Sequence, residues 1–122
     1  MKVHGREIKF LRTVGAVSEV AQVCPQGNIS KLTELFKSEN TVTINDTWAT
    51  LIVALNKGYE MAQRFADKKY KPNPLTKEEC YTLSEDEFSQ LMEEASQAWL
   101  GDKVTIEVEE SKKKAETNET SD

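Results

Sequence analysis

The sequence predicts an α+β fold that is mainly helical, with a small antiparallel sheet packed with four to five helices. Three observations support this prediction. The chain opens on a hairpin pattern around His4-Gly5. Several later segments place apolar residues at the three- and four-residue steps of a helix. Residues 104–109 then alternate apolar and polar side chains, which is typical of a half-buried strand. We expect this strand to pair with the N-terminal hairpin.

Length and composition indicate one domain. The chain has 122 residues, of which 38% are hydrophobic and 30% charged. We expect a globular domain over residues 1–109 and a disordered polar tail over residues 110–122, which lack Leu, Ile, Val and aromatic residues. No apolar run approaches the roughly 18 residues of a membrane helix. The charged N-terminal segment lacks the apolar core of a signal peptide, so we expect a cytoplasmic protein.

The N-terminal hairpin is predicted from its turn residues. Gly5 can adopt the positive φ that a tight turn requires. In the second strand, expected over residues 7–12, Ile8 and Phe10 share one face. His4 is the one histidine of the chain, and its place in the turn indicates a solvated residue rather than a ligand or a catalytic base.

Helical spacing and capping patterns define the elements that follow. The predicted helices cover residues 15–23, 30–37, 46–65, 76–81 and 84–100. The third helix is expected to be capped by Asn45 or Asp46. Gly58 lies inside that helix at a cost of about 1 kcal/mol, for which a close helix crossing is one reason.

Two capping boxes and a C-terminal cap complete the helical pattern. Thr76 and Glu79 form one box, and Ser84 and Glu87 form the second. Around the second box, Leu83 and Phe88 have the spacing of a hydrophobic staple, which fixes the entry into the last long helix. Gly101 is the expected end of that helix.

The sequence lacks the patterns that carry most enzyme chemistry. There is no glycine-rich phosphate loop, and Cys24 and Cys80 have no CxxC spacing, so we expect two reduced, part-buried thiols. Acidic clusters could support acid–base catalysis, but they fall at helix starts or on a polar helix face. These clusters are Glu78-Glu79, Glu85-Asp86-Glu87 and Glu93-Glu94. We therefore expect no enzymatic activity, no metal and no cofactor.

Charge is unevenly distributed along the chain. Residues 1–75 hold 11 basic and 7 acidic side chains, whereas residues 76–122 hold 5 basic and 14 acidic ones. The overall net charge of −5 weighs against nucleic-acid binding, which depends on neutralising phosphates. The basic residues of the first part are scattered rather than grouped, which weakens that interpretation further.

Two apolar stripes suggest a protein-binding surface. Both interpretations of these stripes stay open: they face each other as core, or part of one is exposed as a groove for a partner helix. An acidic rim around such a groove would favour a basic amphipathic partner. The candidate contact residues are Trp48, Leu51, Leu55, Tyr59, Phe88, Leu91 and Trp99.

The first residues carry a resemblance to a known family. The run from Val3 to Ala16 is a short hairpin with glycine in its turn, followed by an apolar-basic strand. It ends in a Gly-Ala pair that opens a helix ahead of Glu19. This resembles the start of the tail assembly chaperones of long-tailed, siphovirus-like phages and prophages. The resemblance is close over residues 1–20 and beyond them is one of size and layout.

The resemblance implies a non-enzymatic role. Such chaperones bind the long tape-measure protein in the bacterial cytoplasm, keep its apolar stretches soluble during tail assembly, and are absent from the mature virion. The tail tube protein and self-association are further contacts that the resemblance leaves open. The family often makes a longer form by ribosomal frameshifting. Lys112-Lys113-Lys114 could be encoded by a slippery adenine run, although a charged solubilising tail explains these lysines as well.

A different function class stays open beside the chaperone. The alternative is a cytoplasmic adaptor, or a phage-encoded host regulator, that binds one folded partner at one-to-one stoichiometry. The chaperone should instead bind one elongated chain in many copies.

Overall fold

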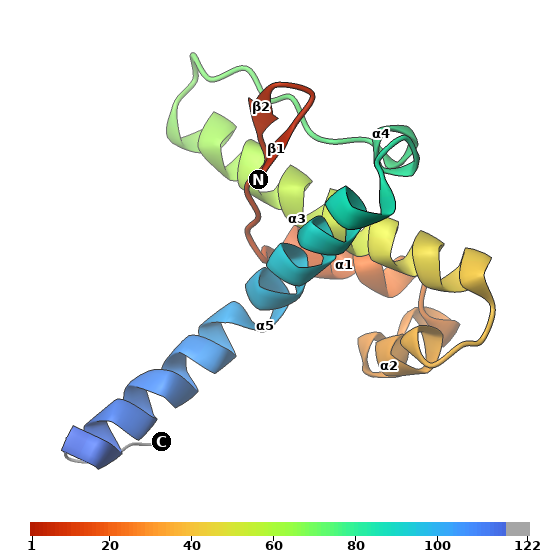
Figure 1. Cartoon of the computed structure of the whole chain (residues 1–122). Coiled ribbons are helices and arrows are strands. Elements are labelled where there is room, and N and C mark those ends of the chain that lie inside the picture. The colour runs from red at the N-terminus through yellow and green to blue at the C-terminus, as the bar shows by residue number, and fades with distance from the viewer. Residues whose placement is uncertain (117–122) are drawn as a thin grey trace.

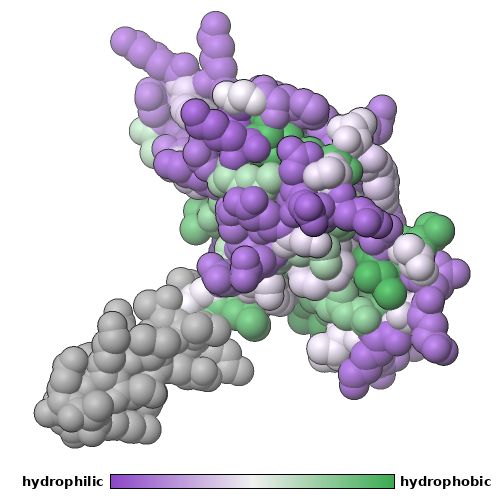
Figure 2. Space-filling view, in the orientation of Figure 1, coloured by the Kyte–Doolittle hydropathy of each residue, from purple (hydrophilic) through white to green (hydrophobic). Residues whose placement is uncertain are grey.

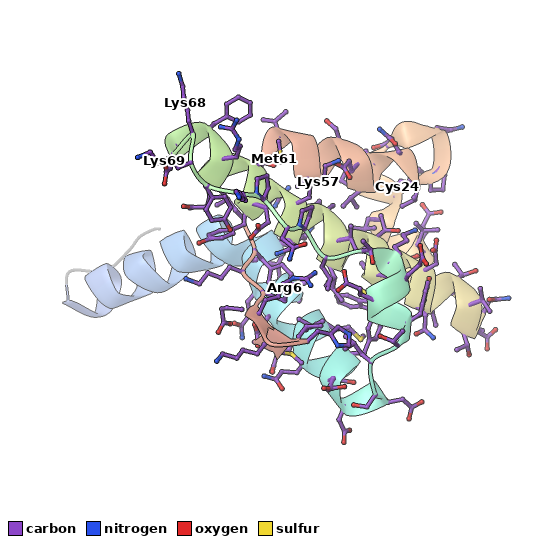
Figure 3. All side chains as sticks on the ribbon, turned by 90° about the horizontal axis from the view of Figure 1, so that it is seen from above. Arg6, Cys24, Lys57, Met61, Lys68 and Lys69 are labelled. Atoms are coloured by element: carbon purple, nitrogen blue, oxygen red, sulfur yellow. The ribbon has the colours of Figure 1, made fainter. Side chains whose placement is uncertain are left out.

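The computed structural model describes the backbone of residues 1–116 and the side chains of residues 1–101. Within this part the fold is mainly helical, with five α-helices and a two-stranded antiparallel sheet, which confirms the predicted fold class. Helix α3, Thr41–Ala66, runs through the middle of the molecule (Figure 1). It packs against α1, Val14–Gln22, and against α5, Glu85–Glu116. Figure 3 shows α1 and α5 on opposite sides of α3.

The N-terminal hairpin forms around the predicted turn. Its strands are β1, Lys2–Val3, and β2, Arg6–Glu7. His4 and Gly5 have φ angles of 50° and 82°, so the turn uses the positive φ expected of Gly5 and extends it to His4. The second strand is only two residues long, shorter than the predicted 7–12.

Beyond β2 the chain lies against α3 instead of continuing the sheet. The Leu11 amide donates to the Leu55 carbonyl at 3.0 Å, and the Asn56 side-chain amide donates to the Lys9 carbonyl at 2.9 Å. The expected alternation survives, because Ile8 is 2% exposed whereas Lys9 faces solvent. The surface that buries Ile8 is thus the helical core rather than a neighbouring strand.

Short helical segments connect α1 to α3. They are the 3-10 segments η1, Pro25–Gly27, and η2, Ile29–Lys31, and the helix α2, Leu32–Phe36. Helix α3 then begins five residues before the predicted start, so the prediction of Asn45 or Asp46 as its cap is wrong. Asn40 is the cap, and its side chain accepts a hydrogen bond from the Thr43 amide at 3.0 Å. The stretch of β-branched residues after Asn40 concealed this helical turn in the sequence.

Both predicted capping boxes are confirmed. In α4, Lys77–Tyr81, the Thr76 hydroxyl accepts from the Glu79 amide at 3.1 Å while the Glu79 carboxylate accepts from the Thr76 amide at 3.0 Å. At the start of α5, Ser84 and Glu87 exchange the equivalent pair of bonds at 3.0 and 3.1 Å. The two boxes fix where α4 and α5 begin.

The C-terminal strand and the helix end at Gly101 are wrong predictions. The backbone over residues 104–109 is helical, because α5 continues to Glu116, and within residues 1–116 the sheet holds only β1 and β2. Two physical reasons account for this. The two-residue strands of the hairpin offer too short an edge for a third strand. The segment also contains no proline, and residues 107–116, which overlap its end, are rich in Glu and Lys, which favour a helix. Residues 110–116 of the predicted disordered tail are part of α5, and residues 117–122 lie outside the described residues.

The core gathers around the middle of α3. Its most buried large side chains from three helices are Val20 in α1, Leu51, Ile52 and Leu55 in α3, and Leu91 in α5. Hydrophobic atoms reach the visible surface only in separate small patches (Figure 2). Among the described residues, none of the helices has the length and apolar character needed to cross a membrane.

Two polar side chains of α3 hold the connector between α3 and α4 in place. Asn56, 1% exposed, accepts from the Leu75 amide at 2.6 Å. Glu60, 6% exposed, accepts from the Asn73 amide at 2.8 Å and from the Tyr70 hydroxyl at 2.9 Å. Because these bonds satisfy buried polar groups, the connector has one defined path along α3. That path leads the chain back beside α3, where α4 packs against it.

Candidate functional site

A groove of about 510 Å³ lies where α4 and the first turns of α5 meet the start of α3. Cys80 and Tyr81 of α4 line it, together with Leu83 of the following turn. Asn45 contributes from α3 and Phe88 from α5. We call this hollow the α4–α5 groove.

The apolar wall of the α4–α5 groove is made by Leu83, Phe88 and Met92. All three are partly buried and pack against the core. Leu83 precedes the cap of α5 and Phe88 is its fourth helical residue, so both belong to the predicted hydrophobic staple. Met92 follows Phe88 by four positions and therefore lies on the same side of α5. The groove thus presents a short apolar stripe that is only partly covered by the chain itself.

The rim of the α4–α5 groove is acidic. Glu85 and Asp86 line it from the first turn of α5, where both are exposed. Neither forms an ion pair with another side chain among residues 1–101. Carboxylates are favourable at a helix N-terminus, so the fold tolerates this concentration of negative charge.

Asp46 lies next to this rim, and its charge is balanced by an ion pair with Lys77. Its Oδ1 accepts from Lys77 Nζ at 2.9 Å and from the Tyr81 hydroxyl at 3.2 Å. The hydrogen bond from Lys77 is the main cause that lowers the pKa of Asp46. The Asp46–Lys77 pair therefore orients Tyr81, whereas Glu85 and Asp86 supply the free negative charge.

Cys80 is a buried thiol rather than a nucleophile. It is 2% exposed, and burial raises its pKa to about 11. A thiol with that pKa is almost wholly protonated at neutral pH, and a thiol needs to ionise to attack. An apolar wall, a carboxylate rim and a neutral thiol form a surface suited to binding.

Three of the seven predicted contact residues belong to the core. Leu51, Leu55 and Leu91 are 2%, 0% and 0% exposed, and they pack between α3 and its neighbours. At these three positions the stripes are core, and the side chains are too buried to contact a partner.

The other four predicted residues are partly exposed but are not gathered on one surface. Phe88 lines the α4–α5 groove. Trp48 packs on Phe36, with ring centroids 4.5 Å apart. Trp99 is covered by Arg12, whose guanidinium lies 4.3 Å from the ring centroid.

Tyr59 lines a separate, shallow hollow of about 530 Å³ between the hairpin and α5. Lys9 lies over its ring, with Nζ 5.9 Å from the centroid. Phe88 is therefore the one predicted contact residue that lies in the acidic-rimmed groove, within the described part of the chain.

Sequence reasoning missed other lining residues. Tyr81 has no apolar neighbour at helical spacing, because the residues three and four positions before it are Glu78 and Lys77, so the sequence gives no signal for its exposure. Leu83 belongs to the predicted staple, and Met92 follows Phe88 at helical spacing, but neither pattern indicates that the side chain stays partly exposed. Leu83 and Met92 are both partly exposed because α4 ends at Tyr81 and does not cover the outer side of the hydrophobic staple.

The His, Cys, Asp and Glu side chains of residues 1–101 form no group of three or more that could hold a metal ion. Comparison with protein-family models, with curated proteins and with solved structures finds no match to this chain.

Proposed function

We propose that this chain is a non-enzymatic tail assembly chaperone of a long-tailed phage or prophage. In this proposal it binds apolar helical stretches of the tape-measure protein in the bacterial cytoplasm and keeps that protein soluble during tail assembly. The observation that carries the proposal is the α4–α5 groove, which combines an apolar wall with a carboxylate rim. Such a groove suits a helix that has an apolar stripe flanked by basic residues.

The size of the groove argues for weak and repeated binding. Each apolar side chain that a partner buries there contributes about 2 kcal/mol. Association itself costs about 4 kcal/mol or more, so two or three buried side chains give a weak contact. A partner with many similar helical stretches would bind one copy at each stretch, and the fraction of stretches covered would rise with the concentration of this chain. Reversible binding of this kind is what a chaperone needs in order to be displaced when the tail tube forms.

Coexpression with a tape-measure protein tests the proposal. We expect the chain to raise the soluble fraction of that protein, measured after centrifugation of the lysate. The double variant Glu85→Gln/Asp86→Asn should lower this gain, because it removes the free charge of the rim. The matched control Glu78→Gln/Glu93→Gln also removes two exposed carboxylates, but neither lines the groove. It should keep the full gain.

Two outcomes would contradict the proposal. If coexpression leaves the tape-measure protein insoluble, the chaperone function is wrong. If both double variants behave like the wild-type chain, and Met92→Gln does as well, the α4–α5 groove is not the binding surface. Circular dichroism of each variant establishes that it is folded before its effect on solubility is compared.

A further inference from the structure

A second groove lies on the other side of α3, against α1. It has a volume of about 360 Å³, and its floor consists of Gly15 and Ala16 of α1 with Gly58 and Ala62 of α3. Met61 and Phe65 form its outer wall. We call it the α1–α3 groove. It shares no residue with the α4–α5 groove.

The outer wall of the α1–α3 groove leaves large apolar side chains in contact with water. Phe65 is 85% exposed and Met61 is 38% exposed. Val14, between two of the lining residues in sequence, is also 85% exposed. An exposed apolar cluster beside a hollow is typical of a surface that another molecule covers.

Basic residues follow the edge of this groove. Lys57 lines it, and Arg64 follows seven positions later, which is two helical turns along the same edge of α3. Lys68 and Lys69 follow Asp67, the residue that caps the end of α3. Figure 3 shows Lys57 and Met61 along α3, with Lys68 and Lys69 beyond its C-terminal end.

The acidic side chains near this edge offset only part of its positive charge. Asp67 is exposed and accepts a hydrogen bond from the Lys69 backbone amide at 3.0 Å. Glu19 on the α1 side is ion-paired with Lys57 at 3.2 Å. Among the side chains of residues 1–101, no ion pair forms with Arg64, Lys68 or Lys69. The open end of the α1–α3 groove is therefore both apolar and basic, the opposite in sign of the α4–α5 groove.

We propose that the α1–α3 groove binds a helical segment of a partner protein that has an apolar stripe edged by carboxylates. The floor and Phe65 would take the stripe, and the carboxylates would meet Arg64, Lys68 and Lys69. A helix edged by basic residues would be repelled at the same edge. This proposal does not rest on the chaperone function, since it depends on a different surface and a partner of the opposite charge.

A synthetic peptide tests the proposal directly. The probe is a labelled helical peptide with leucine at positions i, i+3, i+4 and i+7 and glutamate along both edges. A scrambled peptide of the same composition has no stripe and serves as the peptide control. Fluorescence anisotropy with the full chain should show binding of the striped peptide and about tenfold weaker binding of the scrambled one.

Matched variants locate the binding surface. Phe65→Ser and Arg64→Glu should each weaken binding of the striped peptide about tenfold. Val42→Ser, at a 76% exposed position near the other end of α3, and Lys37→Glu, at the end of α2, should leave it unchanged. Val42 and Phe65 are both highly exposed, so neither substitution opens a cavity in the core.

Three results would overturn the proposal. The first is absence of binding of the striped peptide at millimolar concentration. The second is equal loss of binding in Phe65→Ser and Val42→Ser, which would place the peptide elsewhere. The third is a concentration-dependent dimer of the wild-type chain, measured by sedimentation, that Phe65→Ser abolishes. That result would show that a second copy of this chain occupies the groove.

Discussion

A single carboxylate, that of Glu79, connects two distant parts of the chain. It accepts from Arg6 Nη2 of the hairpin at 3.0 Å and from the Thr76 amide at 3.0 Å. The hydrogen bond from Arg6 is the main cause that lowers the pKa of Glu79, and partial desolvation opposes it. Because the folded chain holds this carboxylate ionised at lower pH than the unfolded chain does, the contribution to stability is complete above the ordinary glutamate pKa. It is lost as the pH falls through the lowered pKa.

Glu79→Gln tests this role. Glutamine can still close the capping box, so the main change is the loss of the charge that faces Arg6. At pH 7 we expect the free energy of unfolding to fall by about 1 kcal/mol or less, since both side chains are partly exposed. Between pH 5 and pH 3 the variant should lose less stability than the wild-type chain. Urea unfolding at pH 7, 5 and 3 measures both effects.

Glu78→Gln is the control for this prediction, because Glu78 is the exposed neighbour of Glu79 in the same helical turn. It should keep the pH dependence of the wild-type chain. An unaltered pH dependence in Glu79→Gln as well would show that the Arg6–Glu79 pair contributes nothing to stability.

At the scale of single residues, the sequence predicts contacts between residues that are close along the chain. The Thr76–Glu79 box depends on a spacing of three residues and was predicted correctly. The bond between Arg6 and Glu79 joins residues 73 positions apart, and no pattern along the chain indicates it. The assignment of Asp46 as a helix cap failed because α3 begins earlier and is capped by Asn40. The partners that Asp46 does have, Lys77 and Tyr81, come from α4 and leave no pattern along the chain.

At the scale of elements, Gly58 explains how α3 and the segment before α1 come together. A Cβ added at Gly58 would lie 2.5 Å from the Leu11 carbonyl oxygen and 2.9 Å from Thr13 Oγ1. The close approach suggested by the sequence is real, but the neighbour is the extended segment before α1 rather than a crossing helix. This contact allows the Leu11 amide to reach the Leu55 carbonyl.

Gly58→Ala should therefore destabilise the fold. Helix propensity alone would favour alanine by about 1 kcal/mol. The clash with a backbone carbonyl should outweigh this gain, and we expect a net loss of about 1–3 kcal/mol in the free energy of unfolding. Gly15→Ala in α1 is the control, because its Cβ would meet only Thr13 Oγ1 at 3.9 Å. It should leave stability unchanged or raise it. If urea unfolding shows both variants equally stable, the close contact at Gly58 does not exist.

The last part of α5 makes a second prediction at this scale. The alternation over residues 104–109 predicted a strand, and the structure places a helix there. Val108→Pro should break this helix and reduce the far-UV circular dichroism signal at about 222 nm, because proline costs about 3 kcal/mol inside a helix. Val108→Ala should retain the signal. A signal that Val108→Pro leaves unchanged would contradict a helix over these residues.

At the scale of the whole molecule, the two grooves lie beside side chains of opposite charge. The acidic excess of residues 76–122 reaches the surface at the α4–α5 groove through Glu85 and Asp86. The basic excess of residues 1–75 reaches it around the end of α3 through the exposed Arg64, Lys68 and Lys69. The sequence predicted this imbalance but could not place it, since the grooves exist only where segments far apart in the chain meet. Such a distribution orients charged partners as they approach.

The number of copies bound to one partner tests the chaperone account most directly. Light scattering gives the molar mass of the complex purified after coexpression with a tape-measure protein. The account predicts several copies of this chain on each tape-measure protein, and fewer copies for Glu85→Gln/Asp86→Asn than for Glu78→Gln/Glu93→Gln. A complex with one copy per partner would contradict it and would favour an adaptor that binds a single folded surface.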